Sequence, residues 1–127
     1  MYQNVKDDIV DEASIKLMVD TFYGKVRQDA LIGPVFDAVV HDWDEHLPTM
    51  YAFWTNLIFR RGDYRGNPFA KHASLDVGRE HFVRWLQLFE ATVAELFRGP
   101  VSEQALNAAK SIAHSFQVRK GIDPFSA

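Results

Sequence analysis

The sequence predicts an all-α protein built from four main helices. Four segments place apolar residues three and four positions apart, which is the spacing of one face of a helix. The chain contains no pair of segments typical of strands, no internal repeat and no low-complexity tract. A chain of 127 residues with 47% hydrophobic content fits one compact domain over residues 1–127.

The first helix is expected in SIKLMVDTFYGKVRQ, residues 14–28, with Ser14 as its N-cap. Its apolar stripe consists of Ile15, Met18, Val19, Phe22, Tyr23 and Val26. Gly33 and Pro34 interrupt the pattern, and a short tight turn after them is expected to carry Phe36.

The second helix is expected around TMYAFWTNLIFRR, residues 49–61, and should end near Gly62. Its shared face consists of Met50, Phe53, Trp54, Leu57 and Ile58. The start of this helix has two interpretations, because Pro48 fits best in the first turn of a helix. Either His46 lies on a turn that leads into the helix, or the helix begins at Asp42 and bends at the proline.

The third helix is expected in REHFVRWLQLFEATVAELF, residues 79–97, and the fourth begins at Ser102 as N-cap and ends by Gly121. Their stripes are Phe82, Trp85, Leu86, Phe89, Val93, Leu96 and Phe97 in the third helix, and Leu106, Ala109, Ile112, Ala113 and Phe116 in the fourth. Residues 62–78 separate the second and third helices as a loop with one helical turn before His72. A loop of that length in a small domain is more often functional than idle.

Composition excludes several classes of function. The formal net charge of −3 arises from 17 acidic and 14 basic residues spread along the chain, which argues against nucleic acid and membrane surfaces as partners. The absence of cysteine excludes disulfides, thiolate zinc sites, iron–sulfur clusters and cysteine nucleophiles. The N-terminal segment does not resemble a signal peptide, and no apolar run approaches the roughly 18 residues of a membrane span. We therefore expect a soluble cytoplasmic protein.

Histidine and carboxylate spacing excludes several metal and nucleophile sites. No histidine follows a glutamate at the spacing of a di-iron bundle, and the zinc metalloprotease pattern, a phosphate-binding glycine loop and a nucleophile elbow are absent. What remains is the pair His46 and His72, on either side of an aromatic-rich helix in a chain that is 13% aromatic.

This pair is consistent with an iron macrocycle. Such a group needs an axial imidazole, an apolar slot with aromatic walls and a second face where a small ligand meets polar groups. His72 could offer one ring nitrogen to iron while its other N–H bonds a carbonyl, which fixes the tautomer. From periodicity alone, an ordinary surface or half-buried histidine is the favoured interpretation.

The chain resembles the truncated haemoglobins, and within them group III, which lacks the paired glycines that flank the first long helix in other groups. The resemblance runs from Ser14 to Phe116 and rests on FYGKVRQDALIGPVF, HLPTMYAFW, GDYRGNPFAKH, HFVRWLQLFE and IAHSF. It implies a truncated globin, in which two antiparallel helix pairs form a two-over-two helical sandwich around haem. It also implies a long loop before the proximal histidine.

Site residues follow from the resemblance position by position. His72 matches the proximal iron ligand, while Tyr23 and Trp85 match hydrogen-bond donors on the distal side. His46 matches the histidine of the distal helix, which could gate entry or bond the ligand, and whether it points at iron or at solvent is left open. Further positions match the walls of the haem slot, namely Phe36, Met50, Phe53, Leu75, Val77 and again Trp85.

Other residues of the same types receive different assignments. Phe22 and Trp54 are assigned to the core, and without the resemblance the wall and donor residues of the helices would be assigned to the core as well. His41, His81 and His114 match no ligand position and are expected to be exposed or structural. Candidates for pairing with the haem propionates are Arg60, Arg61, Arg65, Lys71 and Arg79.

The resemblance implies a protein that carries haem b, iron protoporphyrin IX, and binds dioxygen, nitric oxide or carbon monoxide. Nitric oxide dioxygenation with an external reductase is one activity that it suggests. Two alternatives stay open, namely a peroxidase-like haem enzyme and a cofactor-free helical interaction module.

Overall fold

The computed structural model describes residues 6–60 and 77–122, and everything said below about structure concerns these two ranges. They form five α-helices and no strand, so the all-α prediction is confirmed, but the segment after Gly33 that was expected to be a tight turn is a fifth, short helix. The helices are α1 (Glu12–Gln28), α2 (Gly33–Val39), α3 (Trp43–Phe59), α5 (Arg79–Leu96) and α6 (Pro100–Arg119). The loop expected over residues 62–78 lies almost wholly outside the described residues.

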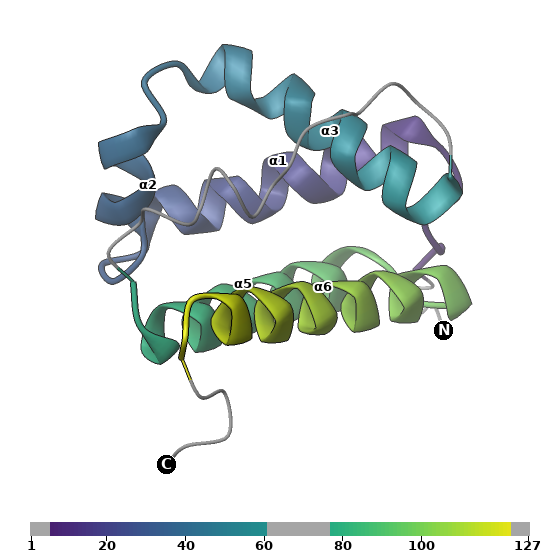
Figure 1. Ribbon diagram of the computed structural model, residues 1–127. Coiled ribbons are helices and arrows are strands. Elements are labelled where there is room, and N and C mark those ends of the chain that lie inside the picture. The colour runs from purple at the N-terminus through teal and green to yellow at the C-terminus, as the bar shows by residue number, and fades with distance from the viewer. Residues whose placement is uncertain (1–5, 61–76, 123–127) are drawn as a thin grey trace, which may run out of the picture.

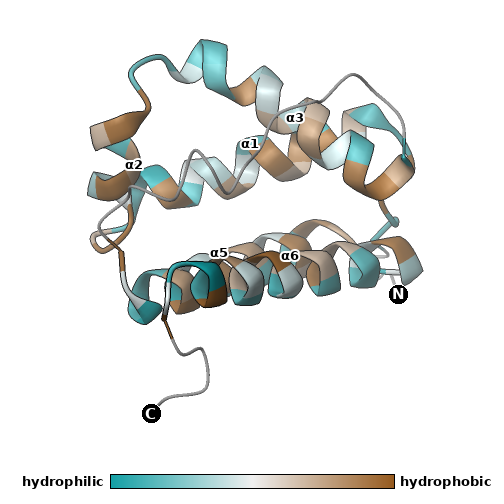
Figure 2. Ribbon diagram, in the orientation of Figure 1, coloured by the Kyte–Doolittle hydropathy of each residue, from teal (hydrophilic) through white to brown (hydrophobic). Residues whose placement is uncertain are grey.

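The helices form two layers (Figure 1). Helices α1 and α3 run side by side in one layer with α2 at one end, and α5 and α6 form the antiparallel pair of the other layer. Helix α1 packs on both α3 and α5, so it joins the layers through the centre of the molecule. Colouring by hydropathy shows apolar residues on the sides of the helices that face the opposite layer (Figure 2).

The core follows the apolar stripe of α1. All six residues of the predicted stripe are buried, and Phe22 has 1% of its surface exposed. They meet Phe89 and Val93 of α5 and Trp54 of α3, which are also buried. The assignment of Phe22 and Trp54 to the core is therefore confirmed.

The N-terminus of α1 differs from the prediction, because Asp11 and not Ser14 is the N-cap. The Asp11 carboxylate accepts a hydrogen bond from the Ser14 backbone N–H at 2.8 Å and another from its hydroxyl at 2.9 Å. Aspartate caps helices as well as serine does, so the earlier residue starts the helix.

The start of α3 settles the two interpretations in favour of the longer helix. Asp42 is the N-cap, its carboxylate accepting from the Glu45 N–H at 3.3 Å, and Pro48 lies inside the helix. His46 is therefore a residue of the first helical turn. The helix ends at Phe59, earlier than predicted, because Arg60 adopts a left-handed conformation with φ of 57°.

Helix α2 carries Phe36, and α5 occupies the predicted third segment. The fourth helix was placed wrongly at its start, because α6 begins at Pro100 and Ser102 lies within its first turn. The cap comes instead from Asp8, whose carboxylate accepts from the N–H groups of Val101 and Ser102 at 2.9 and 2.7 Å.

Candidate cofactor pocket

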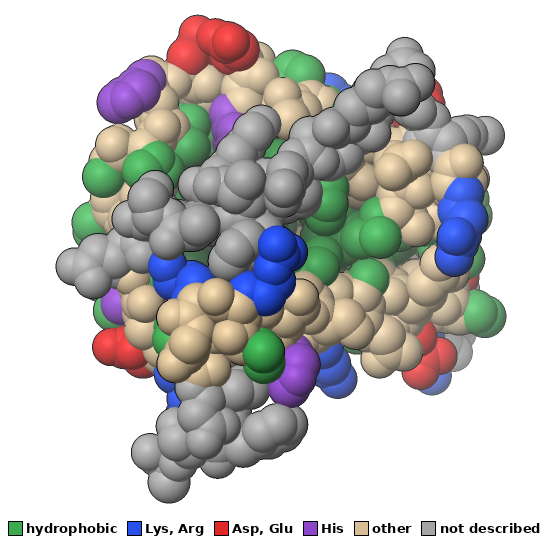
Figure 3. Space-filling view, in the orientation of Figure 1, with side chains coloured by type: hydrophobic (Ala, Val, Ile, Leu, Met, Phe, Trp, Pro, Cys, Tyr) green, Lys and Arg blue, Asp and Glu red, His purple; other side chains and the backbone are tan. Residues whose placement is uncertain are grey.

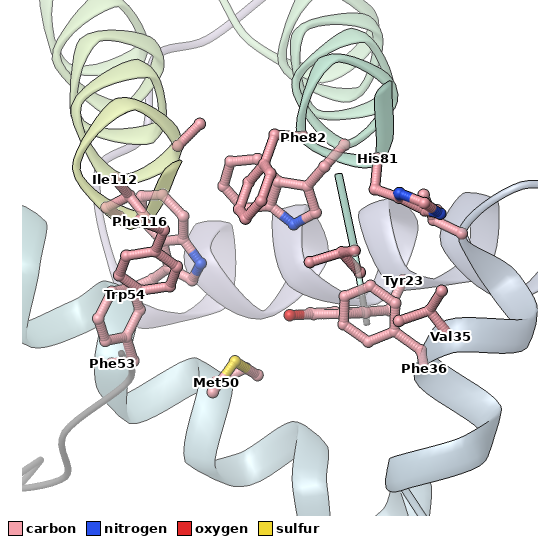
Figure 4. A pocket seen from close by; sticks show the side chains of 14 residues that line it. Tyr23, Val35, Phe36, Met50, Phe53, Trp54, His81, Phe82, Ile112 and Phe116 are labelled. Carbon is pink, nitrogen blue, oxygen red and sulfur yellow. The ribbon is translucent and has the colours of Figure 1, made fainter. Parts of the chain in front are cut away.

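A pocket opens between the two helix layers (Figure 4). Every described helix contributes to its lining, and almost all the lining side chains are aliphatic or aromatic. Among the described lining residues, polar side-chain atoms come only from the Tyr23 hydroxyl, the two indoles of Trp54 and Trp85, and the imidazole of His81. Such a lining is typical of sites for a large apolar ligand that carries few polar groups.

Tyr23 is placed by the inner face of α1. Its side chain is buried, with 6% exposed, and its ring lies edge-on to Phe22 at 5.0 Å and to Phe36 at 5.8 Å between centroids. Its oxygen points into the pocket (Figure 4). Within the two described ranges, this hydroxyl has no hydrogen-bond partner. Burial raises the pKa of the phenol, so Tyr23 stays protonated and can act as a donor.

Trp85 is oriented by stacked rings. Phe89 lies between the two indoles, 5.9 Å from Trp85 at 11° and 5.0 Å from Trp54 at 14°. Phe22 meets the stack edge-on, 5.2 Å from Phe89 and 5.7 Å from Trp85. This aromatic stack joins α3 to α5 and fixes the plane of each indole. Neither indole N–H has a hydrogen-bond partner among the described residues.

His46 lies near Tyr23 but does not line the pocket. It is half-buried in the first turn of α3, its ring 6.0 Å from the Tyr23 ring and 5.6 Å from Trp43. Trp43 in turn packs 5.5 Å from Tyr23 and lies beneath the Arg27 guanidinium at 4.9 Å. His46 therefore packs with Trp43 and Tyr23 in a cluster of rings, and of these three only Tyr23 lines the pocket.

The remaining predicted wall residues divide into two sets. The structure places Phe36, Met50, Phe53 and Val77 on the pocket wall, where their contact with haem stays a prediction. His72 and Leu75 lie outside the described residues, as do the propionate candidates Arg61, Arg65 and Lys71. Of the other two candidates, Arg60 is the exposed C-cap residue of α3 and Arg79 is exposed at the start of α5.

Several lining residues were missed from the sequence. Trp54 is both a core residue and part of the wall, and Ile112 and Phe116 line the pocket from α6. Their spacing of four residues on one helix face could have suggested this. His81 also lines the pocket, four residues before Trp85, and it is half-buried. His41 and His114 are exposed, in line with the expectation for both.

The lining suits a planar apolar group that presents a small polar ligand to buried donors. Flat aromatic rings form the walls, and the O–H and N–H groups that face the pocket have no partners among the described residues. Together with two layers of antiparallel helices, this arrangement defines the class of the protein as a globin of the shortened kind. No described helix is long and apolar enough to cross a membrane.

Comparison with known proteins supports this class and narrows it. The chain is 32% identical over 118 residues to a protein of Campylobacter jejuni subsp. jejuni serotype O:2 named group 3 truncated hemoglobin ctb. The match covers 89% of this chain and 93% of that protein. The chain therefore belongs to the truncated haemoglobins, a family of haem-binding proteins.

A solved structure gives the same result for the fold. The crystal structure of group III truncated hemoglobin from Campylobacter jejuni superposes with a TM-score of 0.85 at 32% identity. The superposition covers 91% of this chain and 94% of that one. No protein-family model matches the chain. The predicted truncated globin fold is confirmed.

Proposed function

We propose that the pocket binds haem b, with His72 as the proximal iron ligand, and that the protein binds dioxygen or nitric oxide beside Tyr23 and Trp85. The observation that carries this proposal is the Tyr23 hydroxyl, which belongs to a buried side chain, stays protonated, opens onto the pocket and has no partner among the described residues. The oxygen opens onto the pocket, so a polar atom of a ligand held there could accept its hydrogen bond.

The chemistry of the pocket residues fits haem. A haem held there would supply an iron with a coordination position for a diatomic ligand. Aromatic rings of α1, α3 and α5 would cover its faces, and the apolar lining would exclude water from the ligand. The stack on Phe89 would hold the Trp85 indole in one plane, so its N–H would keep a constant direction.

Two neutral donors in an apolar pocket favour a ligand whose outer atom carries partial negative charge. Hydrogen bonds to charged groups contribute about 1.5 to 3 kcal/mol each, so each donor would slow ligand escape by roughly tenfold or more. Such slow release of the bound ligand suits a chemical reaction or ligand sensing better than oxygen transport. Nitric oxide dioxygenation with an external reductase is the reaction that we favour. Because the sequence lacks cysteine, we also favour a reducing compartment, the cytoplasm.

The decisive experiment is the absorption spectrum of the reconstituted protein. We expect a Soret band after haem is added, and a shifted band when carbon monoxide is added to the ferrous form. The same spectra report whether His46 occupies the sixth coordination position. A protein with no Soret band would instead be a cofactor-free helical module.

Peroxide activation is the second candidate, because the O–H of Tyr23 and the N–H of Trp85 would also bond to a peroxide in the pocket. Steady turnover of a peroxidase dye by the holoprotein would support it. Nitric oxide consumption in the presence of dioxygen and a reductant, without dye turnover, would support the first candidate.

A further inference from the structure

His81 lies at the end of the pocket formed by the first turn of α5 (Figure 4). Its side chain has 20% of its surface exposed, so it is mostly covered while one edge still reaches solvent. Phe82 and Val77, its close neighbours in the chain, line the same pocket. An occupant that fills the pocket would therefore meet an imidazole at this end.

The hydrogen bonding of His81 fixes its tautomer. Its Nδ1 accepts a hydrogen bond from the Gly78 backbone N–H at 2.9 Å, which requires a lone pair on that nitrogen. The neutral ring must then carry its proton on Nε2. The Glu80 carboxylate lies 3.9 Å from Nδ1 and is 67% exposed, and it would pair with that nitrogen only if the Gly78 bond were broken. The shorter contact decides between the two.

Basic side chains lie near this end of the pocket, and each has an interaction of its own. Arg79 opens α5, and Arg119 and Lys120 end the antiparallel neighbour α6, so all three lie at the same end of the helix pair (Figure 1). Figure 3 shows lysine and arginine side chains gathered over this part of the molecule. Beside His81, the exposed Glu80 is the acidic neighbour in the first turn of α5, and Arg84 one turn later is paired with Asp29.

We propose that His81 donates its Nε2–H to a carboxylate of the bound tetrapyrrole, and so makes the pocket selective for a macrocycle with free carboxylates. This inference rests on the proposed function. Of the polar side chains on the described lining, Tyr23 and Trp54 are buried, whereas His81 keeps one edge at solvent. A carboxylate on the ligand, which keeps part of its hydration, can therefore accept the Nε2–H of His81 at this end of the pocket without being fully desolvated.

The test compares haem with its dimethyl ester, in which both carboxylates are blocked. His81→Gln and His81→Glu both keep an acceptor for the Gly78 N–H, because glutamine and glutamate occupy this position in capping boxes. His41→Gln is the matched control on an exposed histidine. Dissociation constants are measured by Soret titration, and the helicity of each apoprotein is measured by circular dichroism.

We expect H81E, which keeps the acceptor for Gly78 but removes the donor, to weaken haem binding roughly tenfold to a hundredfold. H81Q, whose amide N–H can replace the Nε2–H, and H41Q should bind haem like wild type. For the dimethyl ester, wild type and H81E should bind equally. Equal losses of haem and ester binding in H81E, or no loss at all, would overturn the inference. A low-spin spectrum of wild type that H81Q abolishes would also overturn it, because the His81 ring would then bind iron. If wild type binds haem while the variants show no discrimination, only this inference fails. If wild type gives no Soret band, the proposed function fails with it.

Discussion

The Asp8 carboxylate caps α6 from 94 residues away, accepting the Ser102 backbone N–H at 2.7 Å. Its second oxygen accepts the Val101 N–H at 2.9 Å, so one side chain satisfies two N–H groups of the first turn. Gly99 stands against this carboxylate with φ of 146°, and a Cβ there would lie 2.5 Å from an Asp8 oxygen. These two hydrogen bonds hold the N-terminal segment against the layer formed by α5 and α6.

Removal of this cap should destabilise the protein. We expect Asp8→Ala to lower the free energy of unfolding by about 1 to 2 kcal/mol, because two helix N–H groups lose their acceptor. Gly99→Ala should cost about 1 to 3 kcal/mol, through its backbone conformation and its collision with Asp8. Urea unfolding followed by circular dichroism measures both. An Asp8→Ala protein as stable as wild type would show that water replaces the cap at no cost.

Low pH should destabilise the fold by protonating carboxylates that, like Asp8, accept hydrogen bonds from backbone N–H groups. Desolvation opposes ionisation of Asp8, but hydrogen bonds from three backbone N–H groups outweigh it and lower its pKa. The backbone N–H of Ser14 lowers the pKa of Asp11, and that of Ile32 lowers the pKa of Asp29. Their contribution is complete above the unfolded pKa of about 3.9 and is lost as pH falls through the lower folded values. Unfolding midpoints in urea between pH 7 and pH 2.5 should fall at the acid end, and less steeply in Asp8→Asn.

Asp29 and Arg84 link the turn before α2 to α5. The Arg84 Nε–H donates to Asp29 at 2.7 Å, while the other carboxylate oxygen accepts the N–H groups of Leu31 and Ile32 at 3.1 and 3.0 Å. The Asp29 side chain is 6% exposed, but Arg84 is 42% exposed. We expect Asp29→Ala to cost about 2 to 3 kcal/mol and Arg84→Ala about 1, because Asp29 then keeps its backbone bonds. Equal losses in urea unfolding would mean that the ion pair itself dominates.

The interiors of the helices could be predicted because periodicity reports which face is buried. The stripe in α1 runs without a break from Ile15 to Val26, and every member is buried. Helix ends were less predictable. Ser14 and Asp11 are both good caps three residues apart, and the cap of α6 comes from Asp8, which no local pattern connects to residue 102.

The pocket could be predicted only with the family resemblance, because its residues lie on the same stripes as core residues. Tyr23 belongs to the α1 stripe, and its role depends on a hydroxyl that the fold leaves without a partner among the described residues. Phe22, one residue earlier, is core. His81 was assigned to the surface or to structure, since its place on the lining depends on how α5 meets the opposite layer. The spacing of residues in the sequence does not report how α5 packs against the opposite layer.

The proximal ligand can be tested by removing one imidazole. We expect His72→Ala to lose stable haem, and added imidazole to restore a Soret band by occupying the vacated position. His41→Ala, on an exposed histidine, is the control and should retain haem fully. Identical spectra for His72→Ala and wild type would place the axial ligand elsewhere in the chain.

The distal donors can be tested by separating their effect on ligand from their effect on the fold. Tyr23→Phe removes a hydroxyl that opens onto the pocket and has no partner in the described structure, so the apoprotein should be as stable as wild type or more stable. With haem and dioxygen present, the same change should speed dioxygen dissociation by about tenfold or more, and Trp85→Phe should do likewise. Stopped-flow dissociation rates and urea unfolding of the apoprotein measure the two effects. Phe36→Leu is a control that alters the wall without removing a donor. If the off-rate of the Tyr23→Phe, Trp85→Phe double variant equals that of wild type, neither donor bonds the ligand.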